Sequence, residues 1–186
     1  MNRLDVEKAI QAAGVVLRRE GKEATRLRIL KLLYIADRES LAETGSPILG
    51  SRIVAMKHGP LHSEVLDLIN GGHRDEPKWS LYFQSSGKDV RLSREPATDR
   101  LSRQDIRLLN RVVEKRLPYD DWEVVDETHA FEEWKKCYPN PEESTSRSIP
   151  LDVLLDAVGR GHEKGAIKED IADSAYYDRF FSGISK

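Results

Sequence analysis

The chain has 186 residues, of which 39% are hydrophobic and 33% are charged, and its formal net charge is -2. A chain of this length suits one domain, or one domain with an extension, and it can bury a core without disulfides or metal. Its apolar residues recur periodically, which excludes a disordered chain. The nearly balanced charge leaves no overall electrostatic footprint for nucleic acid or for an anionic membrane.

The single cysteine, Cys137, cannot form an internal disulfide, which indicates a reducing compartment. The sequence has no apolar run near the roughly 18 residues that a membrane-spanning helix needs. Its first residues become polar at once and lack the apolar segment of a secretion signal. We therefore expect a cytoplasmic protein with no membrane partner.

Two helices are predicted in the first part of the chain. The first has apolar residues at a spacing of about 3.6 residues and ends near Gly21, the apolar positions being Val6, Ala9, Ile10, Ala13 and Leu17. The second is predicted over residues 23–43. Its centre, residues 29–36, is apolar nearly all round, which indicates a core helix enclosed by other elements. Gly45 and Pro47 end it.

A short strand is predicted over residues 52–57, because this segment is partly β-branched and is bounded by turn residues. Gly59 and Pro60 then predict the start of a helix, with Pro60 at the first helical position. One apolar face supports this helix, formed by Leu61, Val65, Leu68 and Ile69. Residues 70–72, Asn-Gly-Gly, end it.

A β-hairpin is predicted next, from two apolar pieces at residues 81–83 and 90–92 that are separated by the turn residues 85–88. A polar loop follows over residues 93–100. Ser102 and Asp105 then form a capping pattern that predicts a helix ending at Pro118. Its expected buried stripe is Ile106, Leu109, Val113 and Leu117.

Asp120 and Glu123 repeat the capping pattern and predict a short helix, and residues 132–136 add another turn. Residues 139–148 have the composition of a mobile loop. Two helices are predicted after it, from Pro150 to Gly159 and over residues 166–181. The expected fold is α+β and mostly helical, a compact helical domain with one strand plus a hairpin. We expect a domain over residues 1–138, a loop over 139–149, and C-terminal helices over 150–186 that pack on the same domain.

The sequence contains no pattern typical of a metal site or of nucleophilic catalysis. His58 and His62 are four residues apart, but Pro60 lies between them, so the two do not share a helix face. Cys137 lies near a helix end, where nothing lowers its pKa. Phosphate-binding and dinucleotide-binding glycine motifs are missing too. We expect no metal, no cofactor and no enzymatic activity.

Polar residues directly follow the most buried part of the core helix. Tyr34, Asp37 and Arg38 lie there, and charges in such a place are either paired or at the rim of the core. We favour an Asp–Arg network that fixes the helix against the strand and the turn at residues 57–60, over a direct role in binding. His129 and Trp134 form a similar case, with Trp134 expected in the core.

DNA binding is the main alternative suggested by the order of elements, since helix, strand, helix and hairpin resemble a winged helix. Basic residues also gather near the junction of the first two helices, namely Arg18, Arg19, Lys22, Arg26, Arg28 and Lys31. However, the helix at residues 61–70 carries Glu64 and Asp67 and no Arg or Lys, which is a poor recognition helix. We therefore interpret the basic group as a solvated face.

Three segments together resemble a known family. Residues 31–38 read Lys-Leu-Leu-Tyr-Ile-Ala-Asp-Arg, residues 45–50 read Gly-Ser-Pro-Ile-Leu-Gly, and residues 54–60 read Val-Ala-Met-Lys-His-Gly-Pro. In this order and spacing they resemble the Panacea domain of bacterial and phage antitoxins, also called the SocA-like antitoxin domain. The resemblance covers residues 5–137 well and the C-terminal helices loosely. It places the family motif at Tyr34, Asp37, Arg38, Lys57, His58, Gly59, Pro60, His129 and Trp134.

The resemblance implies an antitoxin that binds and neutralises a toxin encoded by the neighbouring gene. At least one member of that family acts as an adaptor that delivers its toxin to a protease, so the resemblance also implies a cellular protease as a possible partner. It transfers no catalytic residues, so the motif positions are expected to serve binding or structure. The alternative is a winged-helix-like transcriptional regulator, and DNA is the less favoured partner. An enzyme is the third hypothesis, which a deep pocket holding Asp37, His58 and His129 together would revive.

Overall fold

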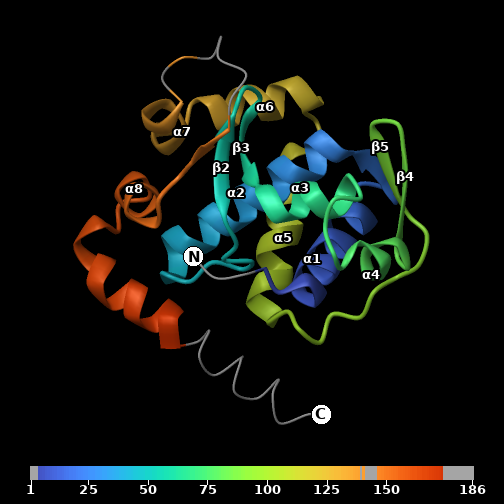
Figure 1. Ribbon diagram of the computed structural model, residues 1–186, viewed down its shortest axis with the longest axis horizontal. Helices are drawn as coiled ribbons and strands as arrows, with labels where there is room; N and C mark the ends of the chain where they lie inside the picture. Colours follow the sequence, from blue (N-terminus) through green and yellow to red (C-terminus); the bar gives the residue numbers. More distant parts are fainter. Residues whose placement is uncertain (1–3, 139, 141–145, 174–186) are drawn as a thin grey trace.

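The computed structural model describes residues 4–138, 140 and 146–173, and Figure 1 shows the arrangement of their helices and strands. The elements follow one another as α1 (Val6–Arg19), β1 (Glu23–Thr25), α2 (Arg26–Thr44), β2 (Ile53–Met56), β3 (Gly59–His62), α3 (Ser63–Ile69), α4 (Glu76–Ser80), β4 (Phe83–Ser86), β5 (Asp89–Leu92), α5 (Arg103–Arg116), α6 (Asp121–His129), α7 (Glu132–Cys137), β6 (Arg147–Ser148), α8 (Leu151–Ala157) and the short 3-10 helix η1 (Gly161–Glu163). Residues 164–173 are again helical.

Helix α2 is the centre of the molecule, as its sequence predicts. Every residue from Arg28 to Asp37 is buried. The helix packs against α1, α5, α6 and β3, and it runs through the middle of the molecule in Figure 1. It ends at Gly45, whose backbone is left-handed with φ 76°, the conformation that glycine adopts most easily.

The start of α2 differs from the prediction that residues 23–43 form one helix. Residues 23–25 form β1, which pairs antiparallel with β5 in a sheet of order β1-β5-β4. The Thr25 side chain accepts a hydrogen bond from the Arg28 backbone nitrogen at 3.1 Å and caps the helix. An N-cap residue needs an extended backbone, so Thr25 serves as the end of a strand and the start of a helix.

The predicted helix start at Pro60 is wrong. Residues 59–62 form β3, an edge strand that pairs antiparallel with β2, and α3 begins only at Ser63. Proline has no backbone N–H, but an edge strand tolerates this loss on its unpaired side. Gly59, with φ 90°, lets the chain reverse at the hairpin. His58 therefore lies at the turn and His62 at the end of the strand, and neither is part of a helix.

The second sheet has the order β3-β2-β6, and its last strand joins distant parts of the chain. Arg147 pairs with Ala55 and Ser148 with Val54. These two residues lie within the segment expected to be a loop, and pairing with a central strand explains the difference. Residue 139 and residues 141–145 of that loop, and residues 174–181 of the predicted last helix, lie outside the described residues.

Helices α5 and α6 begin at the predicted capping boxes. Ser102 and Asp105 exchange side chain–backbone hydrogen bonds, and so do Asp120 and Glu123. Leu117 departs from its expected place in the buried stripe, since it follows the end of α5 and is 48% exposed. The predicted hairpin is present as β4 and β5, although Leu81 lies in the turn before it.

The class expected from the sequence is confirmed, because the molecule is α+β and mostly helical with antiparallel sheets. A single strand plus a hairpin would supply three strands and one pairing, whereas the described residues form two three-stranded sheets with four pairings. Within the described residues, no helix is long and apolar enough to cross a membrane.

Candidate functional site

The motif side chains of α2 meet the β2–β3 hairpin, α6 and α7 in a buried polar cluster. Lys31, Tyr34 and Arg38 recur at intervals of three and four residues, so they lie along one side of α2. Asp37 leaves the helix in another direction. The partners of these four side chains define what the motif does.

Lys31 holds the hairpin to the core helix. Its ammonium, 1% exposed, donates a hydrogen bond of 2.7 Å to the Pro60 carbonyl. Burial lowers the pKa of Lys31 to about 7, because an apolar environment disfavours the charged form. A Cβ on Gly59 would clash with the Thr128 hydroxyl and lie 3.1 Å from the Lys31 Nζ, so the chain needs glycine here for space as well as for its φ of 90°.

Glu133 on α7 is fully buried and accepts hydrogen bonds from two of the motif side chains. The Tyr34 hydroxyl donates to its Oε1 at 2.6 Å and the Arg38 Nε to the same oxygen at 2.7 Å. The Arg38 guanidinium also lies 4.2 Å from the centre of the Phe131 ring. Burial first, and then the Glu133 charge, raise the pKa of Tyr34 well above its ordinary value, so the phenol stays protonated.

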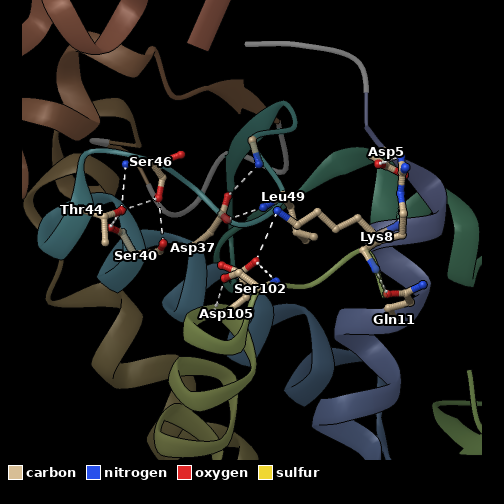
Figure 2. A network of polar contacts seen from close by, with 12 residues as sticks. Asp5, Lys8, Gln11, Asp37, Ser40, Thr44, Ser46, Leu49, Ser102 and Asp105 are labelled. Atoms are coloured by element: carbon tan, nitrogen blue, oxygen red, sulfur yellow. Dashed lines mark hydrogen bonds and ion pairs between the residues drawn. The ribbon is translucent and has the colours of Figure 1, made fainter. Parts of the chain in front are cut away.

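Asp37 binds a different segment from Arg38, so the expected Asp–Arg network is in fact two networks. Its carboxylate accepts hydrogen bonds from the backbone nitrogens of Leu49 at 2.6 Å and Gly50 at 3.2 Å. Figure 2 shows Asp37 pointing from α2 to this loop. Nearby, the Ser40 hydroxyl donates to the Ser46 carbonyl at 2.7 Å. Asp37 therefore fixes the connection that leads from α2 into β2.

Ser51, His62 and Asp37 together have the composition of a hydrolase triad. The Ser51 Oγ lies 2.9 Å from the His62 Nδ1, and the Asp37 Oδ2 lies 3.5 Å from the Nε2. However, all three side chains are at most 2% exposed, so a substrate cannot reach the hydroxyl. Burial lowers the pKa of His62, which favours the neutral ring. The arrangement joins the hairpin to α2 and the 49–51 loop.

His129 and Trp134 stack on each other with ring centres 4.1 Å apart, and the Trp134 Nε1 donates to the Met56 carbonyl at 3.0 Å. Trp134 is buried, as expected. Burial lowers the pKa of His129, and the charge of Lys31 lowers it further. His58 points elsewhere, with its ring edge-on to Trp122 at 5.3 Å.

Asp37, His58 and His129 thus have different partners: the 49–50 loop, Trp122 and Trp134, respectively. None of the three lines the groove described below. In the part of the chain that the structure describes, no group of three or more His, Cys, Asp or Glu residues is placed to hold a metal ion. Cys137 is half-buried, and burial raises the pKa of its thiol.

The basic residues near the first helix junction are mostly engaged by carboxylates. Arg18 and Lys22 pair with Glu95, at 2.9 and 3.9 Å. Arg19 pairs with Glu114 and Arg28 with Glu20. Arg26 instead binds the Asn70 side-chain amide, and Lys31 binds the Pro60 carbonyl. This arrangement leaves little free positive charge for a phosphate backbone.

A solvent-facing surface lies where α5 passes into α6, and we call residues 115–127 the α5–α6 corner. Leu117, Tyr119 and Trp122 are exposed there, to 48%, 41% and 57%. An open groove of about 380 Å³ runs along it, lined by Lys115, Tyr119, Glu123 and Glu127. The sequence analysis did not single out this surface as a binding site.

Sequence reasoning also missed Glu133, His62 and Lys31 as members of the buried cluster. A usable signal exists for Glu133, because a Tyr and an Arg four residues apart on a fully buried helix require an acceptor from elsewhere. For His62 and Lys31 the signal depends on the hairpin, which the sequence did not predict at this position.

Comparison with known proteins agrees with the resemblance of the three motif segments. The family model described as antitoxin SocA-like, Panacea domain, matches residues 29–135, which is more than half of the chain. No curated protein and no solved structure gave a match.

Proposed function

This chain belongs to the antitoxin SocA-like, Panacea domain family, and we propose that it neutralises a protein toxin by binding it directly. The family match carries the proposal. It runs from the core helix α2 to α7 and therefore includes the whole buried polar cluster. We take the toxin to be the product of the neighbouring gene.

The proposed mechanism is stoichiometric. An interface of ordinary size buries about 1,600 Å², and a scaffold that is already ordered lowers the entropic cost of forming it. Several motif positions serve this scaffold, since Tyr34, Asp37, Gly59, Pro60 and Trp134 are buried. Lys57 and His58 are exposed at the hairpin tip, so these two motif positions are open to a partner.

The same complex would allow a second route, in which the protein presents its toxin to a cellular protease. Binding and delivery make different predictions. Binding alone leaves the toxin's half-life unchanged or longer, whereas an adaptor shortens it in cells that contain the protease. A pulse-chase measurement of the toxin, with and without this protein, separates the two.

Co-expression tests the proposal. The neighbouring gene is induced alone and together with this protein, and growth is recorded. We expect growth arrest with the first, rescue with the second, and a stable complex in size-exclusion chromatography. Leu33→Asp is the control, because Leu33 is 1% exposed in the core and a charge there unfolds the scaffold. A neighbouring product that is harmless alone, or that arrests growth despite this protein and forms no complex with it, contradicts the proposal.

A further inference from the structure

The α5–α6 corner concentrates exposed apolar surface. Four large hydrophobic side chains are exposed among the described residues, namely Leu81, Leu117, Tyr119 and Trp122. The last three fall within six consecutive residues. Single exposed hydrophobic residues are ordinary, but a group of them rimmed by polar residues marks an interaction surface. Tyr and Trp are also the residues that most often dominate binding energy in interfaces.

Trp122 is held in place although it is 57% exposed. Its ring contacts the edge of the His58 ring at the hairpin tip, with centres 5.3 Å apart and planes at 76°. Tyr119 lines the groove beside it, together with Lys115, Glu123 and Glu127. An aromatic side chain that is already positioned loses little freedom when it binds a partner.

The charge of this surface is negative. Residues 115–127 contain five Asp and Glu residues against Lys115 and Arg116. Two of the five are paired, Asp121 with Arg28 and Glu127 with Arg116.

The other three carboxylates, Asp120, Glu123 and Asp126, are exposed and have no Lys or Arg ion pair in the described part of the chain. Asp120 and Glu123 cap the start of α6, and Asp126 lies one turn further on. Lys115 in the groove and Lys57 beside His58 are cations at the edges, fewer than the three carboxylates. The corner therefore retains net negative charge around its aromatic side chains.

We propose that the α5–α6 corner is the toxin-binding surface, and that it fits a protein partner with Lys or Arg side chains around an apolar pocket for Trp122. This inference rests on the proposed function. Basic side chains would pair with the free carboxylates and stack on the Trp122 ring. Nucleic acid or an anionic membrane would be repelled, and a second copy of this chain would bring like charges together.

Two variants test the corner, each with a matched control. Trp122→Ala removes the exposed aromatic ring, and Leu81→Ala removes the equally exposed Leu81, at 60%, before β4. Asp126→Lys reverses a free carboxylate near the end of α6, where a cation suits the helix dipole, and Asp67→Lys reverses an exposed one on α3. The binding probe is the purified product of the neighbouring gene, and thermal melting confirms that all four variants are folded.

We expect Trp122→Ala to raise the dissociation constant at least tenfold. We expect Asp126→Lys to lower the association rate constant at low salt at least fivefold. The two controls should stay within twofold of wild type. If the wild type neutralises the toxin and both corner variants bind as it does, the toxin binds elsewhere and the corner inference is overturned while the proposed function stands. If the wild type itself neither binds nor neutralises the product, the proposed function is what fails.

Discussion

Replacing Glu133 with glutamine tests whether the buried carboxylate stabilises the fold. The substitution keeps the shape of the side chain but removes the charge that accepts hydrogen bonds from Tyr34 at 2.6 Å and Arg38 at 2.7 Å. A hydrogen bond to a charged group contributes roughly 1.5–3 kcal/mol and a neutral one roughly 0.5–1.5 kcal/mol. The Tyr34 bond becomes neutral and Arg38 loses its ion pair, so the variant should lose about 2–3 kcal/mol in the free energy of unfolding, or roughly 5–10 °C in Tm for a chain of this size.

Urea denaturation followed by circular dichroism measures this loss. Glu132→Gln is the matched control, because Glu132 is exposed and pairs with Lys135 at the surface, so its loss costs no more than about 0.5 kcal/mol. Tyr34→Phe combined with Glu133→Gln completes a double-mutant cycle, with an expected coupling of about 1 kcal/mol. If Glu133→Gln is no less stable than Glu132→Gln, or if the cycle is additive, the carboxylate does not hold the helix as described.

Three further predictions concern the hairpin and the C-terminal segment. Gly59→Ala should lower the free energy of unfolding by at least about 3 kcal/mol, because the added Cβ clashes with Thr128. Gly71→Ala has a similar φ of 80° but lies in open space, so it should cost about 1–2 kcal/mol. Equal losses in urea denaturation would contradict the packing argument. The pKa of Lys31 is about 7 in the folded chain, against an ordinary value of 10.5. Between these two pH values the unfolded chain binds more protons than the folded chain. The free energy of unfolding therefore rises with pH there, by at most about 1.4 kcal/mol per pH unit. Lys31→Met should flatten this rise, and the same slope in both proteins would refute the assignment. We also propose that the C-terminal helices are part of the same folding unit. A chain ending at residue 138 lacks β6 and the buried Leu154 and Leu155, so its free energy of unfolding should fall by at least about 3 kcal/mol. An unchanged Tm would count against this.

Local sequence signals predicted the helix ends that depend on neighbours in the chain, although they did not predict α4. The Ser102–Asp105 and Asp120–Glu123 capping boxes start α5 and α6 at the expected residues. Gly45 ends α2 for an equally local reason, its left-handed backbone. The motif segments identified the family in the same way, since a family pattern is itself a property of the sequence.

Pairing between strands was the main source of error. Pro60 is compatible both with the first turn of a helix and with an edge strand, and only the pairing of β3 with β2 decides between them. The secondary structure of residues 23–25 and 147–148 is equally ambiguous in the sequence. Their pairing with β5 and β2, respectively, makes them strands. The energy that selects the strand comes from residues far away in the sequence, so a local pattern carries little information about it.

The sequence by itself determined the class of fold, the central place of α2 and the family, because an unbroken apolar helix and an ordered set of motif residues leave few alternatives. The tertiary structure decided which partner each polar side chain has. Asp37 and Arg38 are adjacent in the chain but lie about 100° apart around the helix, so one binds the 49–50 loop and the other binds Glu133. The same geometry buries most of the motif and leaves Trp122 in solvent, and for that reason we place the toxin-binding surface on the α5–α6 corner, where Lys57 and His58 are the neighbouring motif positions.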